Sequence, residues 1–206
     1  MNSMSLRTIL APVAGAVMYL LVGPWPMAAG GTPVIEQLGA RAVAVSGTED
    51  AGRVGIYIER WSTDEELESV GVPLMRGDVE KALEAMRQRR GRVGVVLMPG
   101  VQGRGARTRT RTPKNLLFAR EFSTPEGRRV VVASDERLGL GESQLDARKE
   151  VYEFNVVEIR FGPDGTGIGK VATAPDVVYD PATRSLQVKE YAAKPARLVA
   201  VKPDTF

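Results

Sequence analysis

The 206-residue chain contains neither cysteine nor histidine. Without cysteine it can form no disulfide, thiolate nucleophile or cysteine metal site. Without histidine it lacks the most frequent metal ligand and the usual general base near neutral pH, which excludes serine–histidine and cysteine–histidine catalytic arrangements. An enzyme built from this sequence would have to use carboxylates or lysines. The sequence therefore predicts no catalytic residue, metal site or cofactor, and it favours a protein that is not an enzyme.

Charge is scarce at the N-terminus, where Arg7 is the only charged side chain before Glu36. An apolar run at 9–23 follows Arg7, and two prolines and several small residues come next. This order is the pattern of a cleavable signal peptide, and the run is shorter than the roughly 20 residues of a spanning helix. We therefore expect residues 1–30 to be removed after Gly30 and the protein to be exported to the periplasm or the medium. An uncleaved signal anchor in the inner membrane is the alternative.

Acidic residues are scarce between Arg87 and Arg129, where twelve basic side chains are accompanied by two acidic ones. The rest of the predicted mature chain carries 15 basic and 23 acidic residues. We call residues 87–129 the basic block. A charge asymmetry of this kind predicts attraction to anionic partners and says little about fold.

The basic block contains a segment in which arginine and threonine alternate. In an extended chain this alternation places three guanidiniums on one side, a geometry that suits a row of phosphates or sulfates. The candidate anion-binding residues are Arg104, Arg107, Arg109, Arg111 and Lys114. No aromatic residue lies between 87 and 117, which argues against base stacking and so against specific nucleic-acid recognition. The alternative interpretation is a solvated loop that only aids solubility.

The sequence after the signal peptide predicts a single β-rich domain at 53–206, preceded by a partly ordered arm at 31–52. A strand is expected from Arg53, because apolar residues alternate there with period two. Two helices should follow. Ser62 and Glu65 have the spacing of a capping box at the start of the first helix, which Gly71 and Pro73 should end. The second helix should begin near Asp78.

The remainder of the chain has the pattern of strands joined by short turns. Predicted strands lie at 92–98, 115–122, 128–134, 151–161, 166–172, 177–179, 185–191 and 196–202. A change of phase near Val156 predicts a bulge in the fourth of them. The predicted fold class is α+β: an antiparallel meander that forms a strongly curved sheet or partly open barrel, with a pair of helices after the first main strand.

Two further motifs are candidate sites. Tyr57, Glu59 and Trp61 share one face of the first main strand and could form the floor of a ligand cleft, or they could pack beneath the helices. The segment GPDGTGIGK at 162–170 is glycine-rich, but Lys170 is followed by valine and the expected continuation is a strand. This segment is therefore interpreted as a hairpin turn and not as a phosphate-binding loop.

Four segments of the chain carry a resemblance to known proteins: IERWSTDEE at 58–66, LLFARE at 116–121, VEIRF at 157–161 and VVYDPATRSLQV at 177–188. In these segments the chain resembles a group of exported bacterial proteins that has no assigned activity. The resemblance implies an exported bacterial protein and carries over no residue roles.

The leading functional hypothesis from the sequence is an exported, non-enzymatic module that binds an anionic envelope lipid or polysaccharide through the arginine-rich loop. Peripheral contact with a membrane surface is compatible with it, and no protein partner is indicated. Two alternatives stay open. One is an exported hydrolase that uses carboxylates, and the other is an envelope scaffold that pairs through the edge of its sheet.

Overall fold

The computed structural model describes residues 33–43, 50–89, 91–97, 113–136, 138 and 154–204. The predicted signal peptide, its cleavage site at Gly30 and the arginines at 104–111 lie outside these residues. Among the helices of the described ranges, none has the length and apolar character that crossing a membrane requires.

The described chain folds into two α-helices and eleven strands. Their bounds, in chain order, are β1 Glu36–Val43, β2 Asp50–Ile58, α1 Asp64–Met75, α2 Val79–Arg87, β3 Gly94–Leu97, β4 Pro113–Leu116, β5 Phe118–Thr124, β6 Gly127–Ser134, β7 Asn155–Phe161, β8 Gly167–Thr173, the single 3-10 turn η2 Ala174–Asp176, β9 Val177–Asp180, β10 Ser185–Val188 and β11 Leu198–Pro203.

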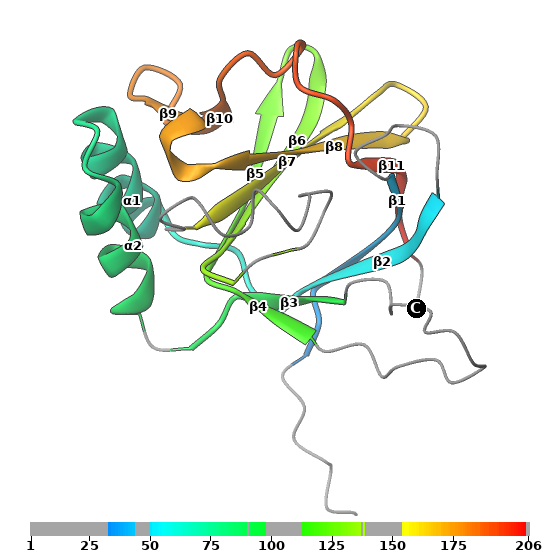
Figure 1. The fold of residues 1–206 in the computed structure, drawn as a ribbon, viewed down its shortest axis with the longest axis horizontal. Coiled ribbons are helices and arrows are strands. Elements are labelled where there is room, and N and C mark those ends of the chain that lie inside the picture. Colours follow the sequence, from blue (N-terminus) through cyan, green and yellow to red (C-terminus); the bar gives the residue numbers. More distant parts are fainter. Residues whose placement is uncertain are drawn as a thin grey trace, which may run out of the picture. The chain divides into compact units, whose positions relative to one another are not determined.

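Nine of the strands form one antiparallel sheet in the order β4-β3-β2-β1-β11-β8-β7-β6-β5. The sheet curls until its two edge strands, β4 and β5, approach each other (Figure 1). These edges are successive in the chain and are separated only by Leu117, whose backbone N–H donates to the carbonyl of Ala133 on β6 at 2.9 Å. The result is a nearly closed barrel with one open seam, which confirms the predicted α+β class.

Two hydrophobic clusters lie on opposite faces of this sheet. The first fills the barrel with alternate residues of its strands, among them Leu38, Ile56, Val132 and Ile159. The second lies outside, where α1, α2 and the β9–β10 hairpin cover β6, β7 and β8; its largest members include Leu67, Phe118, Phe154, Tyr179 and Leu186. Because β6 and β7 are covered on both faces, nearly all of their residues are buried, which makes polar residues on these strands conspicuous.

Both predicted helices are present, with one correction to the bounds of the first. The capping box uses Thr63 and Glu66, one residue later than predicted. Pro73 does not end α1: its carbonyl accepts the N–H of Arg76 at 2.9 Å and of Asp78 at 3.0 Å. The helix therefore continues to Met75. Asp78 caps α2, as the sequence predicts, and its carboxylate accepts from the backbone of Lys81 at 3.0 Å.

Three other sequence expectations differ from the structure. Residues 36–43, expected in a partly ordered arm, form β1, which pairs with both β2 and β11. The predicted bulge near Val156 is absent from the register of β7 with β6, which is continuous from Asn155 to Arg160. β7 is buried on both faces, so a change of polarity along it does not mark a bulge. Finally, β9 pairs with β10 in a separate two-stranded sheet.

Candidate anion-binding site

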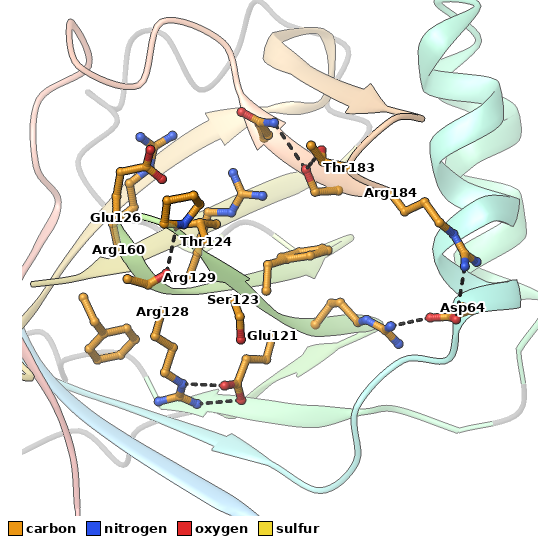
Figure 2. Close-up of a pocket in the computed structure, with 17 residues that line it drawn as sticks. Asp64, Glu121, Ser123, Thr124, Glu126, Arg128, Arg129, Arg160, Thr183 and Arg184 are labelled. Carbon is orange, nitrogen blue, oxygen red and sulfur yellow. Dashed lines mark hydrogen bonds and ion pairs between the residues drawn. The ribbon is translucent and has the colours of Figure 1, made fainter.

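A pocket of about 700 Å³ lies where the β5–β6 hairpin, the end of β7 and the start of β10 meet the first turn of α1 (Figure 2). Five arginines line it and outnumber its three carboxylates. The arginines are Arg120, Arg128, Arg129, Arg160 and Arg184, and the carboxylates are Asp64, Glu121 and Glu126. Thr183, Ser185 and Gln187 add hydroxyl and amide groups to the same wall.

Strand register places two of these arginines directly opposite each other. Phe122 pairs with Arg129 between β5 and β6, Arg129 with Arg160 between β6 and β7, and Arg160 with Ile168 between β7 and β8. We call these four residues the cross-strand row. Like charges directly opposite on one face of a sheet are destabilising, so the Arg129–Arg160 pair requires a compensating anion.

The compensating anion inside the protein is Glu158 on β7, whose side chain is fully buried. Its Oε1 accepts from Nε of Arg160 at 2.7 Å and lies 3.7 Å from Nη1 of Arg129. Its Oε2 accepts the backbone N–H of Val188 at 2.6 Å. One carboxylate thus serves two guanidiniums, and its shorter contact is with Arg160. These three residues together carry one positive charge in excess; Glu158 and Arg129 are buried, whereas the Arg160 side chain is 45 % exposed.

Arg129 is the less compensated member of the cluster. Its side chain is 8 % exposed, and its Nε is buried without a hydrogen-bond partner among the described residues. The guanidinium lies over the ring of Phe122, with Cζ 5.0 Å from the centroid. Burial lowers the pKa of Arg129 and Arg160 adds to this shift, whereas Glu158 and, less strongly, Glu126 and Asp180 oppose it. An unmet buried donor on a charged group is costly, so Arg129 is the position at which a bound anion would contribute most.

Two other arginines fix the wall between α1 and the turn before β10. Arg120 donates to Asp64 and to the carbonyl of Ser62. Arg184 lies 3.4 Å from Asp64 (Figure 2). It also lies 2.8 Å from Glu68. Arg184 has a φ of 47°, a conformation that favours glycine, so its backbone is held in strain. These ion pairs tie the turn to the helix and give the pocket a fixed wall.

Arg128 belongs to the other face of β6. It pairs with Glu36 of β1 and Glu121 of β5, and its guanidinium lies 5.0 Å from the ring centroid of Phe161. Burial alone would lower the pKa of Arg128, but the hydrogen bonds that it donates to the two carboxylates outweigh this effect and the pKa is raised. Arg128 is therefore satisfied within the protein and is not a free anion receptor.

Two carboxylates, the half-buried Asp180 and the exposed Glu126, lie near the mouth of the pocket. Asp180 accepts from the Thr183 hydroxyl and from the backbone of Ala182, and these bonds lower its pKa. Glu126 lies in the β5–β6 turn; a bond with its own backbone and one with Thr124 lower its pKa, with smaller contributions from Arg160 and Arg129. Both carboxylates stay ionised at neutral pH and would compete with an anion that enters.

The basic block predicted from the sequence is largely neutralised in its described part. Arg87 pairs with Asp135, Arg92 with Glu59 and Lys114 with Glu136, at 2.9, 2.8 and 3.3 Å. Most partners lie outside the block in the sequence, and the fold brings them to it. Of the candidate anion-binding residues, only Lys114 is described; Arg104, Arg107, Arg109 and Arg111 lie outside the described ranges.

Tyr57, Glu59 and Trp61, the possible floor of a ligand cleft, make three different contacts in the structure. The Tyr57 hydroxyl lies 3.5 Å from Nε2 of Gln37. Glu59 forms a bidentate contact with Arg92, and Trp61 packs against the cluster that fills the barrel.

The residues of the pocket were missed because their relation depends on strand register. Arg129 and Arg160 are 31 positions apart in the printed sequence and become neighbours only through the β6–β7 pairing. The available signal was local: VEIRF places a glutamate and an arginine inside a strand that is otherwise apolar. No protein-family model, curated protein or solved structure matches this chain, so the functional argument depends on the geometry of the site alone.

Proposed function

We propose that this domain is a non-enzymatic binding protein for an anionic ligand, and that the pocket beside Arg129 and Arg160 receives the anionic group. The observation that carries the proposal is the buried Nε of Arg129, which has no partner in the described chain while Glu158 is shared by two arginines. A carboxylate, phosphate or sulfate oxygen would accept from this donor and compensate the second guanidinium.

The sequence adds two elements to this proposal: export from the cytoplasm, and a contribution of the arginines at 104–114 to binding. An exported protein would meet anionic lipids and polysaccharides in the bacterial envelope. In this proposal the pocket holds one anionic group, and the arginines of the loop contact further charges of the same surface or polymer.

The described geometry gives less support to the two alternative functions. Three strand carboxylates that a hydrolase could use are each engaged by an arginine: Glu59 by Arg92, Glu121 by Arg128 and Glu158 by Arg160. Strand alternation also places Glu121 and Glu158 on opposite faces of the sheet. A scaffold that pairs through a sheet edge would need a long uncovered edge, and β4, one edge of the large sheet, is only four residues long.

Titration with inorganic phosphate tests the proposal. Wild-type protein is compared with Arg129→Met, which removes the donors and keeps the length of the side chain, and with Arg53→Met, a matched change at an exposed site on β2. Hydrogen bonds to charged groups contribute about 1.5–3 kcal/mol, so Arg129→Met should weaken binding at least about tenfold. Arg53→Met should bind as the wild type does. Phosphate also stabilises folded proteins because it is excluded from their surface. This general effect should be the same in Arg53→Met and Arg129→Met, so the difference between the two variants reports binding at Arg129.

A second variant guards against misfolding of the first. Arg129→Lys keeps the charge but loses the Nε donor and the planar fork, so it should bind phosphate more weakly than wild type. Equal affinity of Arg129→Met and Arg53→Met, with melting temperatures showing that both are folded, would rule out this pocket as the site.

A further inference from the structure

The cross-strand row ends in an exposed apolar residue. Ile168 of β8 pairs directly with Arg160 and is 47 % exposed. Large exposed hydrophobic side chains are few in the described chain; the others are Ile35, Met75 and Val178. Ile168 therefore exposes apolar surface to solvent. Arg160 lies on the next strand, and Arg129, with its unpartnered Nε, lies on the strand after that.

A second cavity, of about 610 Å³, lies on the Ile168 side of the row. It shares Arg160 and Phe161 with the arginine-lined pocket, and Ile168, Tyr191 and Ala192 contribute much of its remaining wall. Arg160 stands between the two cavities and is held there by two contacts. Its Nε donates to Glu158 at 2.7 Å, and its Cζ lies 3.8 Å from the centroid of the Tyr191 ring.

We propose that the ligand is an anionic amphiphile, an alkyl or acyl chain that carries a phosphate, sulfate or carboxylate. The anionic group binds at Arg129 and Arg160, and the chain crosses Arg160 and covers Ile168 and the aromatic wall beside it. This inference rests on the proposed function, because it assigns the anionic end to the same pocket, and it adds the chemical nature of the rest of the ligand.

The second cavity is better suited to an apolar group than to a second anion. Its other cation, Lys170, donates through Nζ to the backbone carbonyls of Tyr191 and Ala192, at 2.5 and 3.2 Å. Lys170 is thus largely occupied by the protein. Asp164, which also lines this cavity, would repel an anion. The ring of Tyr191 is already covered by Arg160 and Lys170, whose Cζ and Nζ lie 3.8 and 4.5 Å from its centroid. The apolar side chain that this cavity leaves exposed is therefore Ile168.

A series of monoalkyl phosphates tests the inference, with ethyl, butyl, hexyl and octyl chains used below the concentrations at which they form micelles. Full burial of a methylene strengthens binding about fourfold, and burial on one side about twofold. If each added methylene lowers the wild-type dissociation constant about twofold, the constant should fall about sixtyfold from ethyl to octyl phosphate. Inorganic phosphate should bind with an affinity close to that of ethyl phosphate.

Two serine variants test where the alkyl chain of the ligand lies. Ile168→Ser should flatten the dependence on chain length and leave inorganic phosphate binding unchanged. Val178→Ser, a matched change at an exposed apolar residue on β9, should keep the full dependence. Arg129→Met should weaken all members of the series by a similar factor. Melting temperatures confirm that each variant is folded.

The outcomes separate the two proposals. If inorganic phosphate binds through Arg129 but affinity does not rise with chain length, the amphiphile is refuted and the anion site stands. The amphiphile site is also refuted if the dependence survives in Ile168→Ser, or if it is lost in Val178→Ser. If neither phosphate nor any alkyl phosphate binds, both proposals fail.

Discussion

Replacing Glu158 by glutamine should destabilise the domain strongly. Glu158 is fully buried and is the only carboxylate of the described chain that pairs with both Arg129 and Arg160. Glutamine keeps an oxygen that can accept from the backbone of Val188, so the change removes charge with little change in shape. Removing one partner of a buried ion pair costs about 3–5 kcal/mol. Because the Arg160 side chain is 45 % exposed and water can solvate it, we expect a loss of about 3 kcal/mol, at the lower end of this range.

Urea unfolding measures this loss, and Glu68→Gln is its control. Glu68 pairs with Arg184 at 2.8 Å, but its side chain is 53 % exposed, so the same substitution should cost less than about 1 kcal/mol. Phosphate should restore part of the stability of Glu158→Gln, because a bound anion would replace the missing charge. If Glu158→Gln lost no more stability than Glu68→Gln, Glu158 would not be compensating the arginine pair and the excess charge inferred for Arg129 would be wrong.

Three further predictions concern the mouth of the pocket, the aromatic wall and the N-terminus. Glu126→Gln should strengthen phosphate binding about twofold to threefold in low salt, because it removes a carboxylate near Arg129; unchanged affinity in the titration would show that the turn does not influence the site. Burial, with a contribution from Glu158, raises the pKa of Tyr191 to about 12 from an ordinary value of 10.0. The folded state then retains a proton that the unfolded state loses, so stability should fall between pH 10 and 12, by at most about 1.4 kcal/mol per pH unit. Tyr191→Phe should lose less of its free energy of unfolding between pH 8 and pH 11 than the wild type, as measured by urea unfolding. An equal loss in the two proteins would contradict this assignment to Tyr191. The intact mass of the exported protein should be that of a chain that begins at Gly31. A membrane-bound product that retains Met1 would instead favour an uncleaved signal anchor.

The fold class could be predicted because alternation and turn residues survive in most strands. The β5–β6 hairpin and the cap of α2 at Asp78 follow directly from such local signals. β7 was harder to interpret because both of its faces are buried, and a strand with two covered faces no longer alternates between apolar and polar residues. The place of β1 beside β11 could not be predicted, because no local pattern pairs the first strand with the last.

The candidate site could not be predicted from the charge distribution along the sequence. The basic block suggested a surplus of positive charge, but its described members find acidic partners that come from other parts of the chain, as Arg87 does with Asp135 and Arg128 with Glu36. The surplus lies instead at Arg129, where register sets two arginines against one carboxylate. Pairing between strands, and not the count of charges in a segment, decides where a charge is left uncompensated.

The position of β11 has a consequence for the order in which this domain is made. β11 lies between β1 and β8, and without it the large sheet separates into β4-β3-β2-β1 and β8-β7-β6-β5. Leu38 of β1 pairs with Pro203 of β11, so this contact joins the first strand of the described domain to its last. Contacts of such high sequence separation form late and slowly. A ribosome that synthesises the chain from its N-terminus must therefore release β11 before the large sheet can be completed.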